Sequence, residues 1–257
     1  MHMFVVKKAT IIRAAVFALL VIGVIIYTQT AIGGAAPVIS QAQAMPICRV
    51  ETDKMIVALT FDTAFGEKDY TEEILAELKK ESTRATFCVM GLWATENGPA
   101  VDDIMRDGHE IVSHSMYHER YPDITQNEII EDADEAASLI FEKTGYDTRI
   151  IRLPYGAFDT PAILSLEGEG YIPIKWSLDS KDWKGYDAQK LAQDVLFEVK
   201  SGDIIMFQNN MDQTPKALAA IILGLRERGF KIVSLSELLI DDNYIVDDKG
   251  TQRYIQN

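Results

Sequence analysis

The chain has 257 residues, of which 47% are hydrophobic and 25% are charged. This composition is typical of a folded globular protein with a core of ordinary size, and it excludes a disordered chain. The formal net charge of −14 argues against a nucleic-acid-binding surface, because such a surface needs clustered Lys and Arg to displace counterions. No nucleic-acid partner and no protein partner is predicted.

The N-terminus carries an export pattern. Lys7, Lys8 and Arg13 precede an uninterrupted apolar stretch at residues 14–27, and such positive residues stay on the cytoplasmic side of the membrane. The stretch is short for a span of about 20 residues and fits the core of a signal peptide. Residues 28–36 extend it with mild residues only, which favours an uncleaved anchor.

Removal of this leader stays open, because cleavage is conceivable after Gly33 or after Ala44. We expect an extracytoplasmic domain held at the cell membrane by the N-terminal segment, or a secreted one if the leader is cut. The expected parts are residues 1–33 (basic residues plus signal peptide or signal-anchor helix), 34–46 (linker), 47–240 (one domain) and 241–257 (a polar tail with no assigned structure).

Short β-rich runs alternate with helical patterns along the predicted domain. Strands are predicted at residues 55–61, 85–90, 110–113, 149–151, 171–175, 203–207 and 231–233, and helices at 70–80, 126–143, 188–199 and 215–228. Thr214 and Pro215 predict the cap and first residue of the last helix. This alternation indicates an α/β protein with a parallel sheet, either open and doubly wound or closed as a barrel. No glycine-rich phosphate-binding motif follows the first strand, which excludes the nucleotide-binding forms of the open sheet.

Polar residues follow several of the predicted strands, where parallel α/β folds gather their chemistry. Asp62 follows the first strand, His114 the third, Arg152 the fourth and Asp182 the fifth. Arg152 is a natural partner for Asp62, because a guanidinium can hold a carboxylate with two hydrogen bonds. A helix cap is the alternative role for Asp62.

His114 and His118 stand at positions i and i+4. On one helical turn their imidazoles share a face within reach of a single metal ion. Two surface histidines are the alternative, and the position directly after a strand favours the metal site.

Of the two cysteines, Cys88 lies in an apolar run and is expected to be buried, while a disulfide with Cys48 stays open.

Residues 55–239 resemble the polysaccharide deacetylases of the NodB-homology type, carbohydrate esterase family 4. The motifs, each in order, are T-F-D ending at Asp62, H-S-x-x-H from His114, R-x-P-Y-G from Arg152 and D-x-x-D-W ending at Trp183. Residues 58–66 are most similar to the Gram-positive sporulation and cell-wall branch. The resemblance implies a distorted (β/α)7 barrel, a divalent metal, commonly zinc, and removal of acetyl from N-acetylglucosamine in peptidoglycan or chitin-like chains.

The resemblance also implies roles for the strand-end residues. His114 and His118 would be metal ligands, and Asp62 the general base. Arg152 would orient that base. The backbone N–H of Tyr155 would help to bind the oxyanion of the tetrahedral intermediate.

Two residues depart from the family pattern. The family's usual third metal ligand is an aspartate where this chain has Thr63, whose neutral hydroxyl is a weaker ligand. The family's general-acid histidine is replaced by Gln208, whose amide donates no proton near neutral pH.

Asp182 and Trp183 would support the site, with Trp183 facing the acetyl methyl group, and Met206 and Gln208 would contact substrate.

Three functions follow. The first is a working metal-dependent deacetylase in which water or a carboxylate such as Asp182 supplies the proton. The second is a glycan-binding protein of little or no activity, indicated by Thr63 and Gln208. The third is a hydrolase of another amide or ester on the same scaffold.

Overall fold

The computed structural model describes residues 43–255. The predicted leader and most of the predicted linker lie outside these residues. None of the helices in the described part is long and apolar enough to cross a membrane. The last linker residues lie along the domain, where the Ala44 N–H donates to the Thr160 hydroxyl at 3.2 Å.

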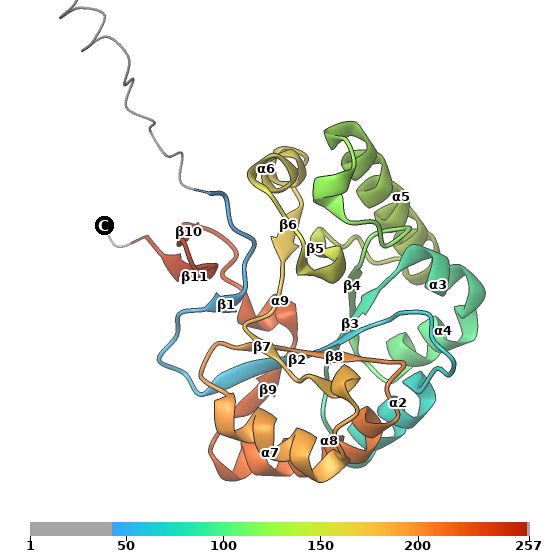
Figure 1. The fold of residues 1–257 in the computed structure, drawn as a ribbon, viewed down its shortest axis with the longest axis vertical. Coiled ribbons are helices and arrows are strands. Elements are labelled where there is room, and N and C mark those ends of the chain that lie inside the picture. Colours follow the sequence, from blue (N-terminus) through green and yellow to red (C-terminus); the bar gives the residue numbers. More distant parts are fainter. Residues whose placement is uncertain (1–42, 256–257) are drawn as a thin grey trace, which may run out of the picture. The chain divides into compact units, whose positions relative to one another are not determined.

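A curved parallel sheet forms the centre of the fold (Figure 1). Its order is β6-β5-β4-β3-β2-β8-β7, and β9 pairs with the first half of β2. Within residues 43–255 the end strands β6 and β7 do not pair with each other, so the barrel is incompletely closed. The predicted distorted barrel is therefore confirmed. The strands are β2 (Ile56–Asp62), β3 (Thr86–Val89), β4 (Glu110–Ser113), β5 (Ile150–Arg152), β6 (Ile172–Ile174), β7 (Leu178–Asp179), β8 (Ile204–Gln208) and β9 (Lys231–Val233).

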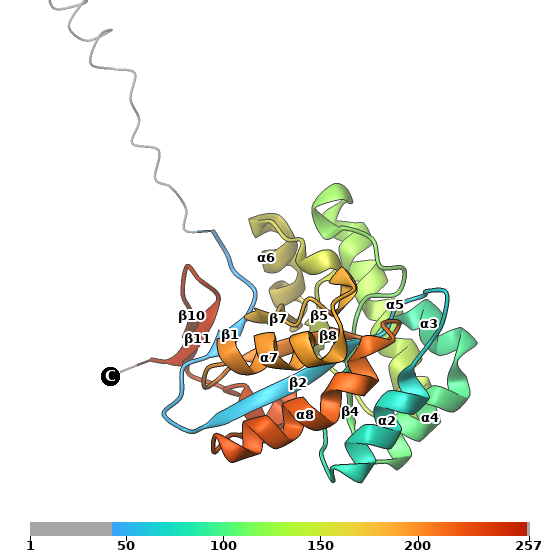
Figure 2. The ribbon, with the colours of Figure 1, turned by 60° about the horizontal axis from the view of Figure 1, so that its bottom comes forward.

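Helices surround the sheet, with α6, α5, α4, α2, α8 and α7 contacting one another in that order (Figures 1 and 2). The helices are α2 (Thr71–Lys80), α3 (Gly91–Glu96), α4 (Gly98–Arg106), α5 (Gln126–Thr144), α6 (Thr160–Gly168), α7 (Ala188–Glu198), α8 (Gln213–Glu227) and α9 (Leu235–Leu238). The four predicted helices are confirmed within two residues at each end. The predicted cap at Thr214 is wrong, because α8 begins at Gln213, two residues before the predicted first residue Pro215, and the Thr214 hydroxyl donates to Asp182 at 2.7 Å instead.

The alternation of side chains along β2 separates the core from the site. Leu59 and Phe61 are fully buried in the apolar layer, where Phe61 stacks between Phe87 and Phe207 at centroid distances of 5.2 and 5.5 Å. Because successive strand residues point to opposite faces, Thr60 and Asp62 share the other face of the sheet. Aromatic packing on one face thus fixes the position of a carboxylate on the other.

The C-terminal residues, for which no element was predicted, form a hairpin of β10 (Tyr244–Val246) and β11 (Thr251–Tyr254). β11 also pairs in parallel with β1 (Arg49–Val50), giving a separate three-stranded sheet. The buried Gln252 side chain bonds both the N–H and the C=O of Ile240. These contacts anchor the tail to the domain.

Cys48 and Cys88 are both buried free thiols, so the disulfide that the sequence left open is not formed. Gly250 packs against Cys48, and a Cβ at Gly250 would lie 2.5 Å from the sulfur. Since Gly250 also has φ +77°, only glycine suits this turn.

Candidate active site

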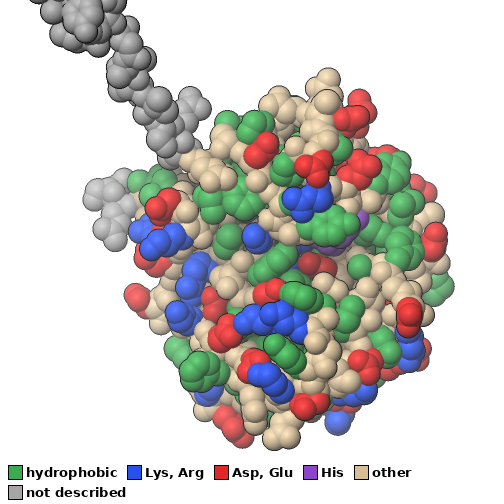
Figure 3. Space-filling view, in the orientation of Figure 1, with side chains coloured by type: hydrophobic (Ala, Val, Ile, Leu, Met, Phe, Trp, Pro, Cys, Tyr) green, Lys and Arg blue, Asp and Glu red, His purple; other side chains and the backbone are tan. Residues whose placement is uncertain are grey.

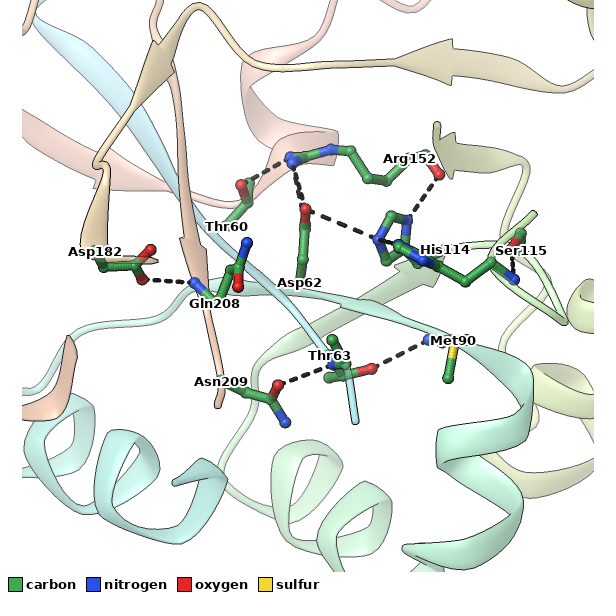
Figure 4. A network of polar contacts seen from close by, with 12 residues as sticks. Thr60, Asp62, Thr63, Met90, His114, Ser115, Arg152, Asp182, Gln208 and Asn209 are labelled. Carbon is green, nitrogen blue, oxygen red and sulfur yellow. Dashed lines mark hydrogen bonds and ion pairs between the residues drawn. The ribbon is translucent and has the colours of Figure 1, made fainter. Parts of the chain in front are cut away.

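Asp62 and Arg152, the last residues of β2 and β5, form a buried ion pair (Figure 4). Arg152 Nη1 donates to both Asp62 oxygens at 3.0 and 3.2 Å, and Nη2 donates to the Thr60 hydroxyl at 2.8 Å. Arg152 is fully buried and Asp62 is 7% exposed. The predicted pairing is present, and Asp62 caps no helix, since α2 begins at Thr71.

His114 and His118 converge, although they do not lie on a helix. The segment from 114 to 120 is a loop, in which Ser115 and His118 have φ of +64° and +59°. The predicted helical turn is therefore wrong. The two Nε2 atoms nevertheless lie 3.1 Å apart, so the loop brings the imidazoles together in a different way.

The orientation of His114 is set by the backbone of β5. Its Nδ1 lies 2.9 Å from the Arg152 carbonyl oxygen, which places the ring proton on Nδ1 and leaves the Nε2 lone pair free. Nε2 lies 3.9 Å from Asp62 Oδ2. Burial lowers the pKa of His114, and burial and then the neighbouring His114 lower the pKa of His118 to about 4. Both imidazoles are therefore neutral near pH 7, the form that binds a metal.

Asp132 holds the loop that carries His118, and nothing in the sequence pattern pointed to it. This α5 carboxylate accepts the N–H groups of Met116 and Tyr117, both at 3.1 Å, and the Tyr121 hydroxyl at 2.9 Å. Burial raises the pKa of Asp132. A carboxylate inside an amphipathic helix usually faces solvent, so only the packing of α5 on the loop reveals this contact.

The two imidazoles fit a metal ion, since an Nε2 separation of 3.1 Å accommodates two zinc–nitrogen bonds of about 2.0–2.1 Å. Thr63 does not add to this pair, because it is fully buried and its hydroxyl accepts the Met90 N–H at 3.1 Å. Among the described residues, no group of three His, Cys, Asp or Glu side chains could hold an ion. The residues present thus offer two neutral ligands and lack a third charged one.

Gln208 and Asp182 lie together at the end of β8. Gln208 pairs in register with Asp62 on the neighbouring strand, and within residues 43–255 its side-chain amide makes no hydrogen bond. Asp182 Oδ2 accepts the Gln208 N–H at 2.8 Å and the Thr214 hydroxyl at 2.7 Å, whereas Oδ1 is buried without a partner. Burial raises the pKa of Asp182 to about 6.

Tyr155 has φ +58°, and its backbone N–H donates to no acceptor in the described part of the chain. Its predicted role in binding the oxyanion stays a prediction. Trp183 was predicted to face the acetyl methyl group. It is 49% exposed, its indole N–H donates to Asp179 at 3.4 Å, and it does not line the groove that contains Asp62 and His118. Trp176 lines that groove instead, with the Arg152 guanidinium 5.3 Å from its ring centroid.

Six of the predicted site residues line one groove of about 460 Å³. Figure 3 shows the histidine surface recessed among hydrophobic side chains. The lining comprises Asp62, His114, His118, Tyr155, Met206 and Gln208, together with Ala64, Phe65, Met90, Leu92, Tyr117 and Trp176. A larger cavity of about 760 Å³ lies around His109 and Glu110, at the opposite end of the strands, and contains none of the predicted site residues. The smaller groove is therefore the candidate active site.

A family model described as polysaccharide deacetylase matches residues 49–173. A peptidoglycan-N-acetylglucosamine deacetylase of Bacillus cereus is 30% identical over 195 residues, which cover 74% of this chain and 91% of the relative. This chain belongs to the polysaccharide deacetylase family. The peptidoglycan-N-acetylglucosamine deacetylase PgdA of Listeria monocytogenes is 29% identical over 199 residues. The match covers 77% of this chain and 42% of PgdA.

Solved structures of the family include both an active enzyme and a pseudoenzyme. The Bc1960 peptidoglycan N-acetylglucosamine deacetylase matches with TM-score 0.71 and 26% identity, over 75% of this chain and 91% of that one. A CE4 family pseudoenzyme from Bacillus anthracis matches with TM-score 0.72 and 27% identity, over 82% and 70%. A mutant of this pseudoenzyme with restored enzymatic activity also has TM-score 0.72. The deacetylase fold therefore does not by itself establish turnover.

Proposed function

We propose that this protein removes N-acetyl groups from N-acetylglucosamine units of cell-wall polysaccharide with the help of a divalent metal, zinc by family resemblance. One observation carries the proposal: the Arg152-held carboxylate of Asp62 and two converging neutral imidazoles line a single groove. This combination suits hydrolysis of an amide. The peptidoglycan deacetylases among the relatives support the choice of substrate.

Each residue of the groove has a separate role in the proposed reaction. Asp62 accepts a proton from the attacking water, and Arg152 holds its carboxylate in place. The Tyr155 N–H donates to the oxyanion that develops on the amide oxygen. A divalent ion held by His114 and His118 would supply Lewis-acid polarisation.

The leaving amine needs a proton that Gln208 does not supply. Asp182 is the nearby group with a raised pKa, but its carboxylate is 2% exposed and Oδ2 is occupied by the Gln208 N–H and the Thr214 hydroxyl. Water is the other donor. Asp182 is buried and mostly ionised at pH 7, and water is a weak acid, so we expect a slow enzyme.

A second candidate is a glycan-binding protein that has kept the groove with little turnover. Two observations favour it: the Thr63 hydroxyl is engaged by the Met90 N–H, and the Asp182 Oδ1 faces no donor. The family includes a pseudoenzyme, from Bacillus anthracis, which supports the possibility of a member with little turnover.

The test is acetate release from N-acetylglucosamine oligomers and from peptidoglycan by the purified full-length protein with added zinc. We expect release that Asp62→Asn reduces by about 10²–10⁴-fold, the usual contribution of a general base. Binding of the oligomers without any release of acetate would support the second candidate.

We also propose that the domain lies outside the cytoplasm, held by the N-terminal segment or secreted. Lys7, Lys8 and Arg13 before an apolar stretch support this location. Protease added to intact cells should digest the domain. Digestion only after lysis would refute the location.

A further inference from the structure

We infer that Phe65 and Tyr117 form two stacking positions for sugar rings next to the reacting N-acetylglucosamine, so that the groove takes a glycan chain rather than a single sugar. The inference rests on the proposed glycan substrate. It assigns a binding role to Phe65 and to Tyr117, which occupies a variable position of the H-S-x-x-H motif.

The aromatic side chains of Phe65 and Tyr117 are about half exposed to water inside the groove. Phe65 is 49% exposed and Tyr117 is 48% exposed, and both line the groove that contains Asp62 and His118. The face of a pyranose ring carries C–H groups, which pack on an aromatic face and remove both surfaces from water. Exposed aromatic rings in the groove of the reacting groups therefore fit sugar rings next to the reacting unit.

The backbone on both sides of Phe65 is fixed in advance. The Ala64 N–H donates to Asn209 Oδ1 at 2.9 Å, and the Phe65 carbonyl accepts from Asn210 Nδ2 at 3.1 Å. Gly66 packs so closely on Asn210 that a Cβ would lie 2.8 Å from the Asn210 Cβ. The end of β8 thus holds this loop in place, which reduces the entropy lost when a ligand binds.

Tyr117 is held at both of its ends. Its N–H donates to Asp132 at 3.1 Å, and its hydroxyl lies 2.8 and 2.9 Å from the two oxygens of Glu135. The hydroxyl is already occupied by a carboxylate, so the ring rather than the hydroxyl is what Tyr117 offers to the groove. Its removal should therefore weaken stacking more than hydrogen bonding.

The charges of the groove select the kind of polymer. Among the described residues that line it there is no Lys or Arg, and Asp62 is the only carboxylate. Apart from a metal ion at His114 and His118, an anionic polymer would find no cation among these lining residues, whereas a neutral N-acetylglucosamine chain needs none. The structure therefore favours a neutral glycan over an acidic one.

The experiment is calorimetric binding of N-acetylglucosamine monomer and tetramer to the full-length protein. The wild type should bind the tetramer more tightly than the monomer, and Phe65→Ala or Tyr117→Ala should each weaken tetramer binding about five- to tenfold. Tyr117→Phe, which keeps the ring, should retain tetramer affinity. Phe141→Ala is the matched control, since Phe141 is 56% exposed but does not line the groove.

Two results would overturn the inference: equal affinity of the wild type for monomer and tetramer, or full tetramer affinity in both alanine variants. Acetate release is measured on the same proteins. Ring-dependent tetramer binding without acetate release would support the stacking positions and reject the deacetylase. Acetate release with ring-independent binding would do the reverse.

Discussion

Asp182 accepts the Gln208 N–H through Oδ2 at 2.8 Å, while its Oδ1 is buried without a hydrogen-bond partner. A buried acceptor without a donor is costly. It lies beside the strand end where the family carries a histidine. An imidazole at position 208 could donate one ring N–H toward Oδ1 and direct the other nitrogen into the groove.

Gln208→His should therefore raise the kcat for deacetylation, toward the 10²–10⁴-fold that a general acid typically contributes. The increase in kcat from Gln208→His should exceed the increase from Thr63→Asp. Added zinc can offset weak metal binding by mass action, but it cannot replace a proton donor. Steady-state kinetics at saturating zinc distinguish the two, with Gln208→Leu as the control that adds no donor. A slower Gln208→His enzyme would mean that the wild type has another proton route.

Zinc binding should require both histidines of the convergent pair. We expect His114→Ala or His118→Ala to abolish stoichiometric zinc, because each removes one of only two ligands. His109→Ala should retain the metal, since His109 lies in the cavity at the opposite end of the strands. Elemental analysis measures this directly, and zinc retained by the double variant of His114 and His118 would refute the site.

Arg152→Met should destabilise the fold by about 3–5 kcal/mol, because it leaves the Asp62 carboxylate buried without its ion-pair partner. Replacing both residues, as Arg152→Met with Asp62→Leu, should cost less than Arg152→Met alone, since no uncompensated charge remains. Urea denaturation gives the free energies of unfolding. If the double variant is less stable than the single one, the buried charge is not the cause.

The raised pKa of Asp182 makes stability depend on pH. The folded carboxyl has a pKa of about 6, against the ordinary aspartate value of 3.8, so the folded state binds the proton more tightly. Stability attributable to Asp182 is therefore highest below pH 3.8 and falls as pH rises through 6, by up to about 3 kcal/mol. The difference in unfolding free energy between wild type and Asp182→Asn should change accordingly from pH 4 to pH 7, and parallel pH curves would exclude this effect.

The strand ends were the most predictable part of the site. Asp62 and Arg152 each end an apolar run, and parallel strands bring such ends to one rim, so their pairing could be predicted from sequence. The meeting of His114 and His118 was also predictable, but its geometry was not, since Ser115 and His118 adopt positive φ without the glycine that would signal it.

Other features depend on contacts between distant segments. The side chains of Asp132 and Asn209 accept backbone N–H groups of other segments, those of Met116 and Ala64 respectively. Trp176, which precedes the short strand β7, lines the groove, whereas Trp183, which follows β7, does not. No local pattern reports which of two nearby tryptophans faces a cavity.

The pairing of β1 with β11 joins residues about 200 positions apart, such as Arg49 and Thr251. Such a contact is among the slowest to form, because the intervening chain must first be ordered. During synthesis β1 cannot pair with β11 until residues 251–254 have been made. A product truncated near residue 240 would leave the edge of β1 that faces β11 unpaired, which is a site for aggregation. The small sheet can therefore form only after residues 251–254 are made, so the segment next to the predicted export signal gains this contact late.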